Sequence, residues 1–350
     1  MICDSQDYKS WPSEDLEEVS ACPLCGGTDR KLLYAGARDR TFFCAPGEWN
    51  LWACENCNCA YLSPRPVLNS IGRAYSQYYT HASHGAPRNN SLLKQIYHSL
   101  RYAYFSKQMD EHRRVSYPGR MAVSVASTIF GNQWQFHDAR LYPPRKAARL
   151  LDIGCGGGDY LALANAIGWR AEGIDTDPGA VANAVAKGCN ARHSNIEEEI
   201  LRSVGLYDAI TLSHVIEHLH NPVDTLKACR RLLRPGGRIW LSTPRLYGPG
   251  HKRFGADWLH LDTPRHLVLF TEQNLKSSLL AAGFTCPEFR PRGRHVTHVW
   301  KCSHAIRRGY DPLKNSLKLP LGVRMIALQE DLKSMFSPHS GDEIVLIAES

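Results

Sequence analysis

The sequence predicts an α/β fold in which a parallel sheet carries helices on both faces. Strand-like and helix-like segments alternate between residues 148 and 245, which is the pattern of parallel sheets. A glycine-rich loop follows the first of these strands. With 350 residues, of which 43% are hydrophobic, the chain can bury a sizeable core in one large domain and a smaller one.

The first strand runs directly into glycines at alternate positions. The chain passes through Asp152 to Gly154, Gly156 and Gly158. Glycines at these positions let a ligand approach the bare backbone. The helix expected over 160–167 offers the ligand its free amides and the positive end of its dipole.

The elements that follow continue the alternation. A second strand, 170–175, ends at Asp175, roughly 20 residues beyond the loop, where a nucleotide-binding fold places the carboxylate that binds ribose hydroxyls. The alternative role for Asp175 is a helix cap. The other expected elements are helices at 178–187, 226–233 and up to 283, and strands at 207–212 and 238–242.

The loop distinguishes two classes of cofactor. The dinucleotide fingerprint is G-x-G-x-x-G, whereas this chain has D-x-G-x-G-x-G, in which Asp152 suits a cationic or amine-bearing ligand. The pattern resembles motif I of class I S-adenosylmethionine-dependent methyltransferases, and 232–237 resembles the turn before their fifth strand. This resemblance, over 148–245, implies S-adenosyl-L-methionine rather than NAD. It also implies a Rossmann-like seven-stranded methyltransferase sheet, with a sixth strand at 284–290 and an antiparallel seventh at 341–348.

The resemblance further implies which residues contact the cofactor. They are Asp152, Gly154, Cys155, Gly156 and Gly158 around the methionine part, Asp175 with its neighbour Thr176 at the ribose, Asn195 and Ile196 beside adenine, and Ser213 and His214 near the sulfonium. Asp152 would act through an amide or a water molecule. The alternative interpretation of Asn195 is a turn residue.

Two C-x-x-C pairs near the N-terminus predict a structural zinc site. The expected ligands are Cys22, Cys25, Cys54 and Cys57. Each pair places two thiolates on one side of a tight turn, as tetrahedral zinc requires. Residues 49–53 lead into the second pair like a strand, and the whole resembles a zinc ribbon. Cys59 could replace Cys57 as the fourth ligand, and reduced cysteines in a small β-fold are the alternative to zinc.

Three side chains after the strand at 207–212 are candidates for catalysis. If the chain turns helically there, His214, Glu217 and His218 share one face at the carboxyl edge of the sheet. The segment resembles the E-x-x-E-H segment of ubiquinone-biosynthesis and small-RNA 2′-O-methyltransferases, except that His214 replaces the first Glu. In those families it contributes to a divalent-metal site. A fourth ligand is expected at His266, with His260 as second choice. A general base without metal and a purely structural role remain the alternatives.

The composition and the motifs together predict the organisation of the chain. We expect a zinc-ribbon-like module over 1–66, a helical cap over 67–145 and a methyltransferase domain over 146–350. Within that domain we expect an acceptor-loop insertion near 246–270 and a helical insertion near 300–338. No apolar run approaches the length of a membrane span, and twelve cysteines without a visible secretory signal indicate a reducing, cytoplasmic compartment. A basic amphipathic stretch at 313–336 leaves peripheral contact with a membrane open.

The predicted activity is S-adenosylmethionine-dependent methyl transfer to an oxygen or carbon of a small-molecule, sugar or lipid-linked acceptor. The net charge of +8 favours an anionic acceptor such as a nucleotide sugar, a phosphorylated lipid or RNA, but does not choose among them. The alternatives are an RNA-modifying methyltransferase and a non-catalytic binding protein that keeps the fold. The sequence does not predict an oligomeric state.

Overall fold

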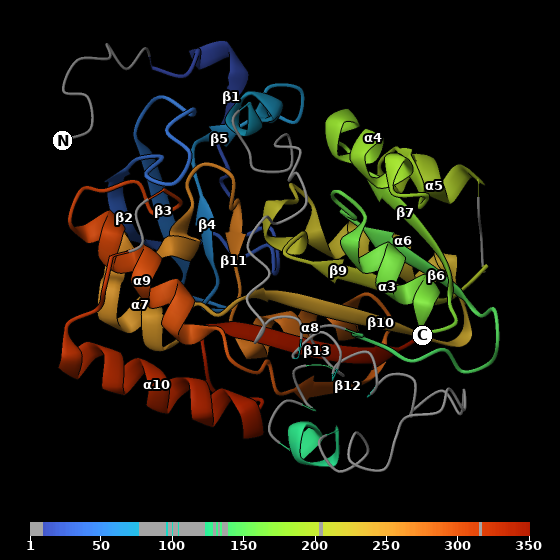
Figure 1. Cartoon of the computed structure of the whole chain (residues 1–350). Helices are drawn as coiled ribbons and strands as arrows, with labels where there is room; N and C mark the ends of the chain where they lie inside the picture. Colours follow the sequence, from blue (N-terminus) through green and yellow to red (C-terminus); the bar gives the residue numbers. More distant parts are fainter. Residues whose placement is uncertain are drawn as a thin grey trace.

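The chain is described here from a computed structural model (Figure 1). The described residues are 10–76, 96, 100, 104, 123–128, 131, 134, 139–202, 206–314 and 317–350. Most of the helical cap predicted over 67–145, including its expected helices near 91–107 and 108–114, therefore lies outside the described residues.

A large mixed sheet forms the centre of the described structure. Its seven described strands have the order β12-β13-β10-β9-β6-β7-β8, and β13 runs antiparallel to both of its neighbours. The strands are β6 (Arg149–Ile153), β7 (Arg170–Asp175), β8 (Asn190–His193), β9 (Tyr207–Ser213), β10 (Leu233–Pro244), β12 (Thr285–Arg290) and β13 (Glu343–Glu349). The Rossmann-like seven-stranded sheet expected from the sequence, with an antiparallel last strand, is confirmed.

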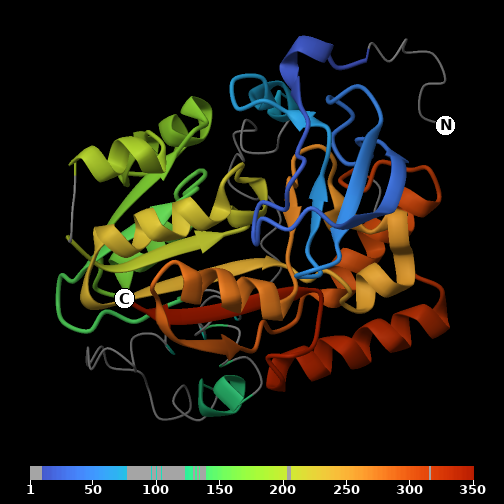
Figure 2. The same ribbon diagram turned by 180° about the vertical axis from the view of Figure 1, so that it is seen from behind.

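Helices cover both faces of this sheet. They are α3 (Asp159–Ala166), α4 (Pro178–Ala186), α5 (Ile196–Arg202), α6 (Pro222–Leu232) and α8 (Glu272–Ala281). Figure 1 has α3 in front of the sheet, and the reverse view in Figure 2 has α6 and α8 in front of it. Two of these helices begin at side-chain caps: Asp177 caps α4 by accepting a hydrogen bond from the backbone of Gly179, and Thr271 and Asn274 form a capping box at α8.

A smaller sheet lies beside the carboxyl edge of the central one. Its order is β11-β4-β3-β2, and a separate two-stranded sheet pairs β1 with β5. The strands are β1 (Leu16–Glu17), β2 (Arg30–Ala37), β3 (Trp49–Cys54), β4 (Ala60–Leu62), β5 (Arg65–Pro66) and β11 (Val268–Leu269). The strand β11 comes from the predicted acceptor loop. One buried apolar cluster, to which Leu51 and Leu241 both belong, joins the two sheets into a common core.

The remaining elements lie mainly in the predicted insertions. They are the helices α7 (Pro249–Phe254), α9 (Val296–Arg307) and α10 (Leu321–Phe336), and the short 3-10 helices η1 (Ser13–Asp15), η2 (Ile71–Tyr75), η5 (Ile216–His218), η6 (Gly255–Asp257) and η7 (Leu259–Leu261). The described residues of 313–336 contain one helix rather than two, and α9 begins just before the expected insertion. None of the helices described is both long and apolar enough to span a membrane.

Candidate functional site

The glycine loop has the backbone that the sequence predicts. Gly154, Gly156 and Gly158 all have positive φ, at 71°, 51° and 80°. A Cβ on Gly154 would lie 2.4 Å from Cγ2 of Val215, whereas a Cβ on Gly156 would meet open space. Gly154 therefore permits close packing against the loop after β9, and Gly156 leaves exposed backbone beside which a ligand fits. This backbone is compatible with the cofactor contact that the resemblance implies, which stays a prediction.

Asp152 is buried beneath the glycine loop, whereas the resemblance implies that it lies beside the cofactor. Its carboxylate is buried and accepts hydrogen bonds from Nη1 of Arg140 at 2.6 Å and from Oγ1 of Thr211 at 2.5 Å. Burial raises the pKa of Asp152 despite the nearby arginine. The neighbouring Cys155 is also buried. The structure thus describes Asp152 as a group that supports the loop from beneath, and its contact with the cofactor stays a prediction.

Asp175 joins the end of β7 to the glycine loop. Its Oδ2 accepts from the backbone N of Gly156 at 2.8 Å, and its Oδ1 from that of Asp177 at 2.9 Å. Because Asp177 is the cap of α4, the alternative role of Asp175 as the helix cap is wrong. The adjacent Thr176 is exposed. Asp175 is therefore positioned beside Gly156, as a ribose-binding carboxylate would be.

The pair predicted to flank adenine begins α5. Oδ1 of Asn195 accepts a hydrogen bond from the backbone N of Glu198 at 2.9 Å, so Asn195 is at least a helix-capping residue. Ile196 is buried. Both follow β8, which pairs in parallel with β7, so they lie at the same edge of the sheet as Asp175.

The sequence predicts that His214 forms one helical turn with Glu217 and His218, and this prediction is wrong. Its φ is +54°, and the helical turn η5 starts only at Ile216. The imidazole of His214 instead lies between two carboxylates, with Nδ1 3.2 Å from Glu217 and Nε2 3.3 Å from Glu343. Burial would lower the pKa of His214, but the two carboxylates raise it to about 10. A protonated imidazole cannot act as the general base at neutral pH. Ser213, which ends β9, is half-buried beside it.

Glu217, His218 and His266 do come together. One ligand atom of each lies within 4.8 Å of the others. Nδ1 of His218 lies 3.0 Å from the carbonyl of Arg265, and Nδ1 of His266 lies 2.7 Å from that of His260, so each Nδ1–H donates to the backbone. This arrangement leaves both Nε2 atoms with a free lone pair, as in metal-binding histidines.

Glu217 completes this group as its anionic member. It is fully buried, and Oε2 accepts a hydrogen bond from Thr243 at 2.9 Å. Oε1 has no hydrogen-bond partner, because the nearby Nδ1 of His214 is not aligned with it. Burial would raise the pKa of Glu217, but His214 and the other histidines lower it to about 2. An ionised, partly unsatisfied carboxylate beside two free imidazole nitrogens fits a divalent metal ion.

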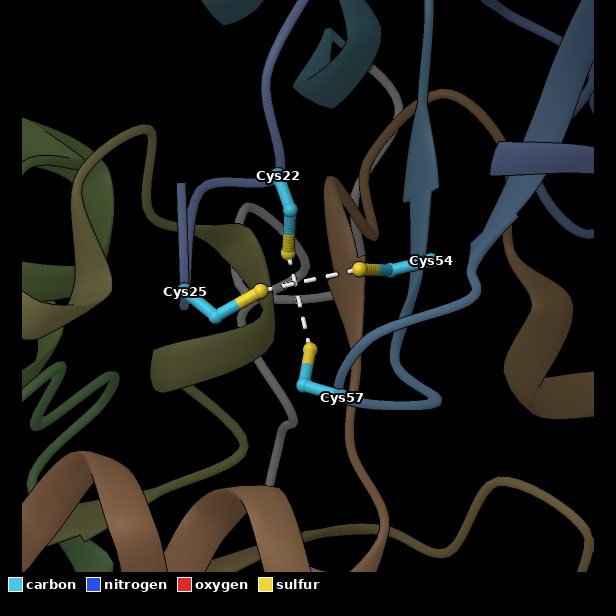
Figure 3. A group of neighbouring side chains, drawn as sticks. All are labelled: Cys22, Cys25, Cys54 and Cys57. Atoms are coloured by element: carbon cyan, nitrogen blue, oxygen red, sulfur yellow. Dashed lines mark hydrogen bonds between the residues drawn. The ribbon is translucent and has the colours of Figure 1, made fainter. Parts of the chain in front are cut away.

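The four predicted zinc ligands converge in the small sheet. Figure 3 shows the sulfur atoms of Cys22, Cys25, Cys54 and Cys57 pointing toward one centre, and all four lie within 4.8 Å of one another. The tight turn after the first pair has the positive φ expected from the sequence, 73° at Gly26. Cys59 also lies near this group, with its Sγ 3.3 Å from that of Cys22. The residues fit a tetrahedral zinc ion, with Cys57 as the fourth member of the group.

Two residues of the site could not be predicted from motifs. Arg140 reaches Asp152 from the segment before β6, and its guanidinium stacks 3.6 Å over the ring of Tyr160. Tyr75 lies with its hydroxyl 2.9 Å from Nδ1 of His218. Arg140 is 12 residues from Asp152 and Tyr75 is 143 residues from His218, and neither belongs to a motif with its partner.

Comparison with known proteins identifies related sequences over part of this chain. Residues 135–288 match the family described as "Methyltransferase domain". The chain is 35% identical over 102 residues to the ubiquinone biosynthesis O-methyltransferase of Xanthomonas oryzae pv. oryzae, covering 27% of this chain and 43% of that protein. It is also 35% identical over 112 residues to the enzyme of the same name from Burkholderia thailandensis, covering 30% of this chain and 47% of that protein.

The matches are partial in length. The aligned segments span less than half of these relatives. Among solved structures, a SAM dependent methyltransferase from Archaeoglobus fulgidus is 20% identical, covers 71% of this chain and 99% of that chain, and has a TM-score of 0.41.

Proposed function

We propose that this chain transfers a methyl group from S-adenosyl-L-methionine to a hydroxyl oxygen of a small-molecule, sugar or lipid-linked acceptor. The match of residues 135–288 to the family described as "Methyltransferase domain" supports this activity. One observation carries the proposal. The glycine loop follows β6, and Glu217 and His218 of the Glu217–His218–His266 group follow β9, which is the parallel neighbour of β6. The cofactor cradle and the candidate acceptor site therefore lie at the same edge of the sheet.

The reaction makes two demands on the site. The acceptor oxygen must lie in line with the methyl group and the sulfonium, and the acceptor hydroxyl must lose its proton. The free Nε2 atoms of His218 and His266 are the groups available to accept that proton, since both Nδ1–H groups are held by backbone carbonyls. In the alternative, a divalent ion bound to Glu217 and to these Nε2 atoms would occupy their lone pairs and would instead lower the pKa of the acceptor hydroxyl. A protonated His214 would partly neutralise the negative charges of Glu217 and Glu343, between which it lies.

Cofactor binding is the first test of this proposal. We expect titration calorimetry to detect S-adenosyl-L-methionine binding to the full chain, and Asp175→Ala to weaken it by about tenfold, or ~1.4 kcal/mol, because the ribose contact is lost. Asp224→Ala, which removes an exposed carboxylate from α6, serves as the control and should bind as the parent does. A full chain that gives no binding heat contradicts the proposal.

The acceptor site is tested separately. We expect a panel of catechols, sugars and nucleotide sugars, incubated with the cofactor and analysed by mass spectrometry, to yield an O-methyl product. His218→Asn and His266→Asn should lower kcat by about 10²- to 10⁴-fold without changing cofactor affinity, because they remove proton transfer but not the cradle. His339→Asn changes an exposed histidine away from the group and should leave kcat unchanged. Full turnover in both site variants would refute the catalytic assignment.

Transfer to RNA is the second candidate, and the net charge of +8 favours it. Several arginines, however, already pair with carboxylates inside the fold, namely Arg149, Arg192, Arg265 and Arg292. The charge available for phosphates is therefore smaller than the composition indicates. A salt titration of RNA binding with a steep slope would favour RNA, and weak binding with a flat slope would remove it. A non-catalytic protein would bind the cofactor and methylate nothing in either assay.

A further inference from the structure

A second group of metal-competent side chains lies near the first, and no motif predicts it. His260 lies in η7, His295 immediately precedes α9, and Glu343 begins β13. One ligand atom of each lies within 4.8 Å of the others. We propose that His260, His295 and Glu343 bind a divalent transition-metal ion, in a site separate from the Glu217–His218–His266 group. Two imidazoles and one carboxylate suit Fe²⁺, Zn²⁺ or Mn²⁺.

A buried nitrogen without a partner is the main support for this site. His260 is 8% exposed, and its Nε2 has no hydrogen-bond partner. Its ring lies between those of His214 and His295, with centroids 5.9 and 6.1 Å away and ring planes inclined by 28° and 22°. Stacked rings do not satisfy a nitrogen lone pair, and leaving a buried polar atom unsatisfied costs free energy. A metal ion at the centre of the group would satisfy it.

The carboxylate of Glu343 is held in place by outer partners. Arg292 forms an ion pair with its Oε2, and Oγ of Ser242 donates to the same oxygen at 3.2 Å. Oε1 faces His295, whose Nε2 is 2.6 Å away, and is more distant from Arg292, at 3.5 Å. One oxygen is therefore anchored by Arg292 and Ser242, while the other faces His295. Metal-binding carboxylates are oriented by hydrogen bonds of this kind.

His295 is positioned by the start of α9. Oδ1 of the buried Asp331, on α10, accepts hydrogen bonds from the backbone N of His295 and of Val296, each at 2.8 Å. Its Oδ2 accepts from Oγ1 of Thr297 at 2.5 Å. These bonds fix the first turn of α9 against α10, so His295 projects from a rigid element, as a preorganised ligand should.

A structural ion-pair network is the competing explanation. Glu343 already faces His214, Arg292 and His295, and such a network would hold the elements together without an ion. The two explanations differ in what they say about His260, because the network gives its Nε2 no partner. Metal content is therefore the measurement that separates them.

The test counts metal ions per chain in the purified full-length protein. Iron, zinc and manganese are measured by mass spectrometry, and the number of Mn²⁺ sites by spin resonance during titration with Mn²⁺ alone. We expect His260→Asn and His295→Asn each to lose one ion per chain relative to the parent. His339→Asn is the matched control and should lose none. Equal metal content in the parent, His260→Asn and His295→Asn would overturn the proposal.

A second comparison separates this site from the proposed acceptor site. His218→Asn should remove a different ion, so the His218→Asn/His260→Asn double variant should lose two. Loss in His260→Asn but not in His218→Asn would leave the present proposal standing and remove metal from the acceptor site. Retention of the zinc held by the four cysteines, together with an unchanged circular dichroism spectrum, verifies that each variant is folded.

Discussion

The glycines of the loop after β6 differ in what surrounds them. Gly154 and Gly156 belong to the same motif of alternate glycines, and both have positive φ. Only Gly154 lies against another side chain, since an added Cβ would collide with Val215, whereas Gly156 faces open space. One glycine therefore serves the packing of the protein, and the other serves the approach of a ligand.

This difference leads to a prediction at the residue scale. We expect Gly156→Ala to keep the fold, at a cost of about 1 kcal/mol for its left-handed backbone, and to weaken S-adenosyl-L-methionine binding by about tenfold, because the methyl group occupies the cradle. Gly188→Ala has the same kind of backbone, at φ 80° and in open space after α4, and should cost similar stability without affecting affinity. Thermal unfolding and calorimetry measure the two effects. Equal affinity in both variants would contradict the prediction.

Gly154→Ala should behave differently from either. Its Cβ would meet Val215 at 2.4 Å, so we expect an additional loss of about 1–3 kcal/mol from overpacking. A variant as stable as Gly156→Ala would show that the loop after β9 moves freely.

At the scale of elements, one carboxylate ties three neighbouring strands together. Glu172 on β7 pairs with Arg149 on β6 at 2.6 Å and with Arg192 on β8 at 3.2 Å. Burial would raise the pKa of Glu172, but the two arginines hold it below its ordinary value of 4.5. The carboxylate therefore stabilises the fold above that value, and this stabilisation is lost as the pH falls below it.

We accordingly expect Glu172→Gln to lower the free energy of unfolding by about 2 kcal/mol at neutral pH, because it leaves Arg149 without its carboxylate partner and leaves Arg192 with Glu199 alone. The difference from the parent should shrink as the pH falls through the range below 4.5. Urea denaturation across that range measures it. Asp224→Asn, at an exposed ion pair with Lys227, should change stability by less than about 0.5 kcal/mol at every pH. A loss in Glu172→Gln that does not depend on pH would rule out the ion-pair explanation.

The same scale shows what the sequence can and cannot predict. The strands β6, β9 and β10 could be predicted because each contains a short apolar run between helical segments, and β3 because it leads into a C-x-x-C pair. The strand β8 is short and polar, so its own pattern does not indicate it. The strand β11 was not predictable, since it has only two residues, which pair with Tyr61 and Ala60 of β4. Likewise Glu217 and His218 share a motif, whereas His295 and Glu343 belong to separate elements that only the folded sheet brings together.

At the scale of the whole molecule, the N-terminal cysteine module is joined by direct contacts to the loop that carries His266. The backbone N of Leu62 donates to the carbonyl of Leu267 at 3.0 Å. The fully buried Arg265, from the same loop, pairs with Asp39 of the N-terminal module at 2.5 Å. The loop that carries His266 is thus anchored on the small sheet, while the glycine loop is anchored on the central one.

We propose that the four cysteines hold zinc, and we expect its removal to affect the two halves of the site unequally. A Cys25→Ser/Cys54→Ser variant should lose one zinc ion per chain and expose the backbone around β11 to hydrogen exchange, because metal binding supplies folding free energy to such modules. Its affinity for S-adenosyl-L-methionine should stay within about twofold, or ~0.4 kcal/mol, of the parent. Cys286→Ser, at an exposed cysteine, is the control. Unchanged exchange around β11 after zinc loss would contradict this coupling.

The pairing of β11 with β4 also has a consequence for synthesis on the ribosome. β4 ends at Leu62 and β11 begins at Val268. The N-terminal sheet therefore lacks its last strand while the ribosome adds residues 63–267. At typical rates of translation this interval lasts roughly 10 to 40 s. Throughout it, β4 presents an unpaired edge, which is a template for wrong pairing with other chains. The growing chain therefore needs that edge to be shielded until the loop emerges.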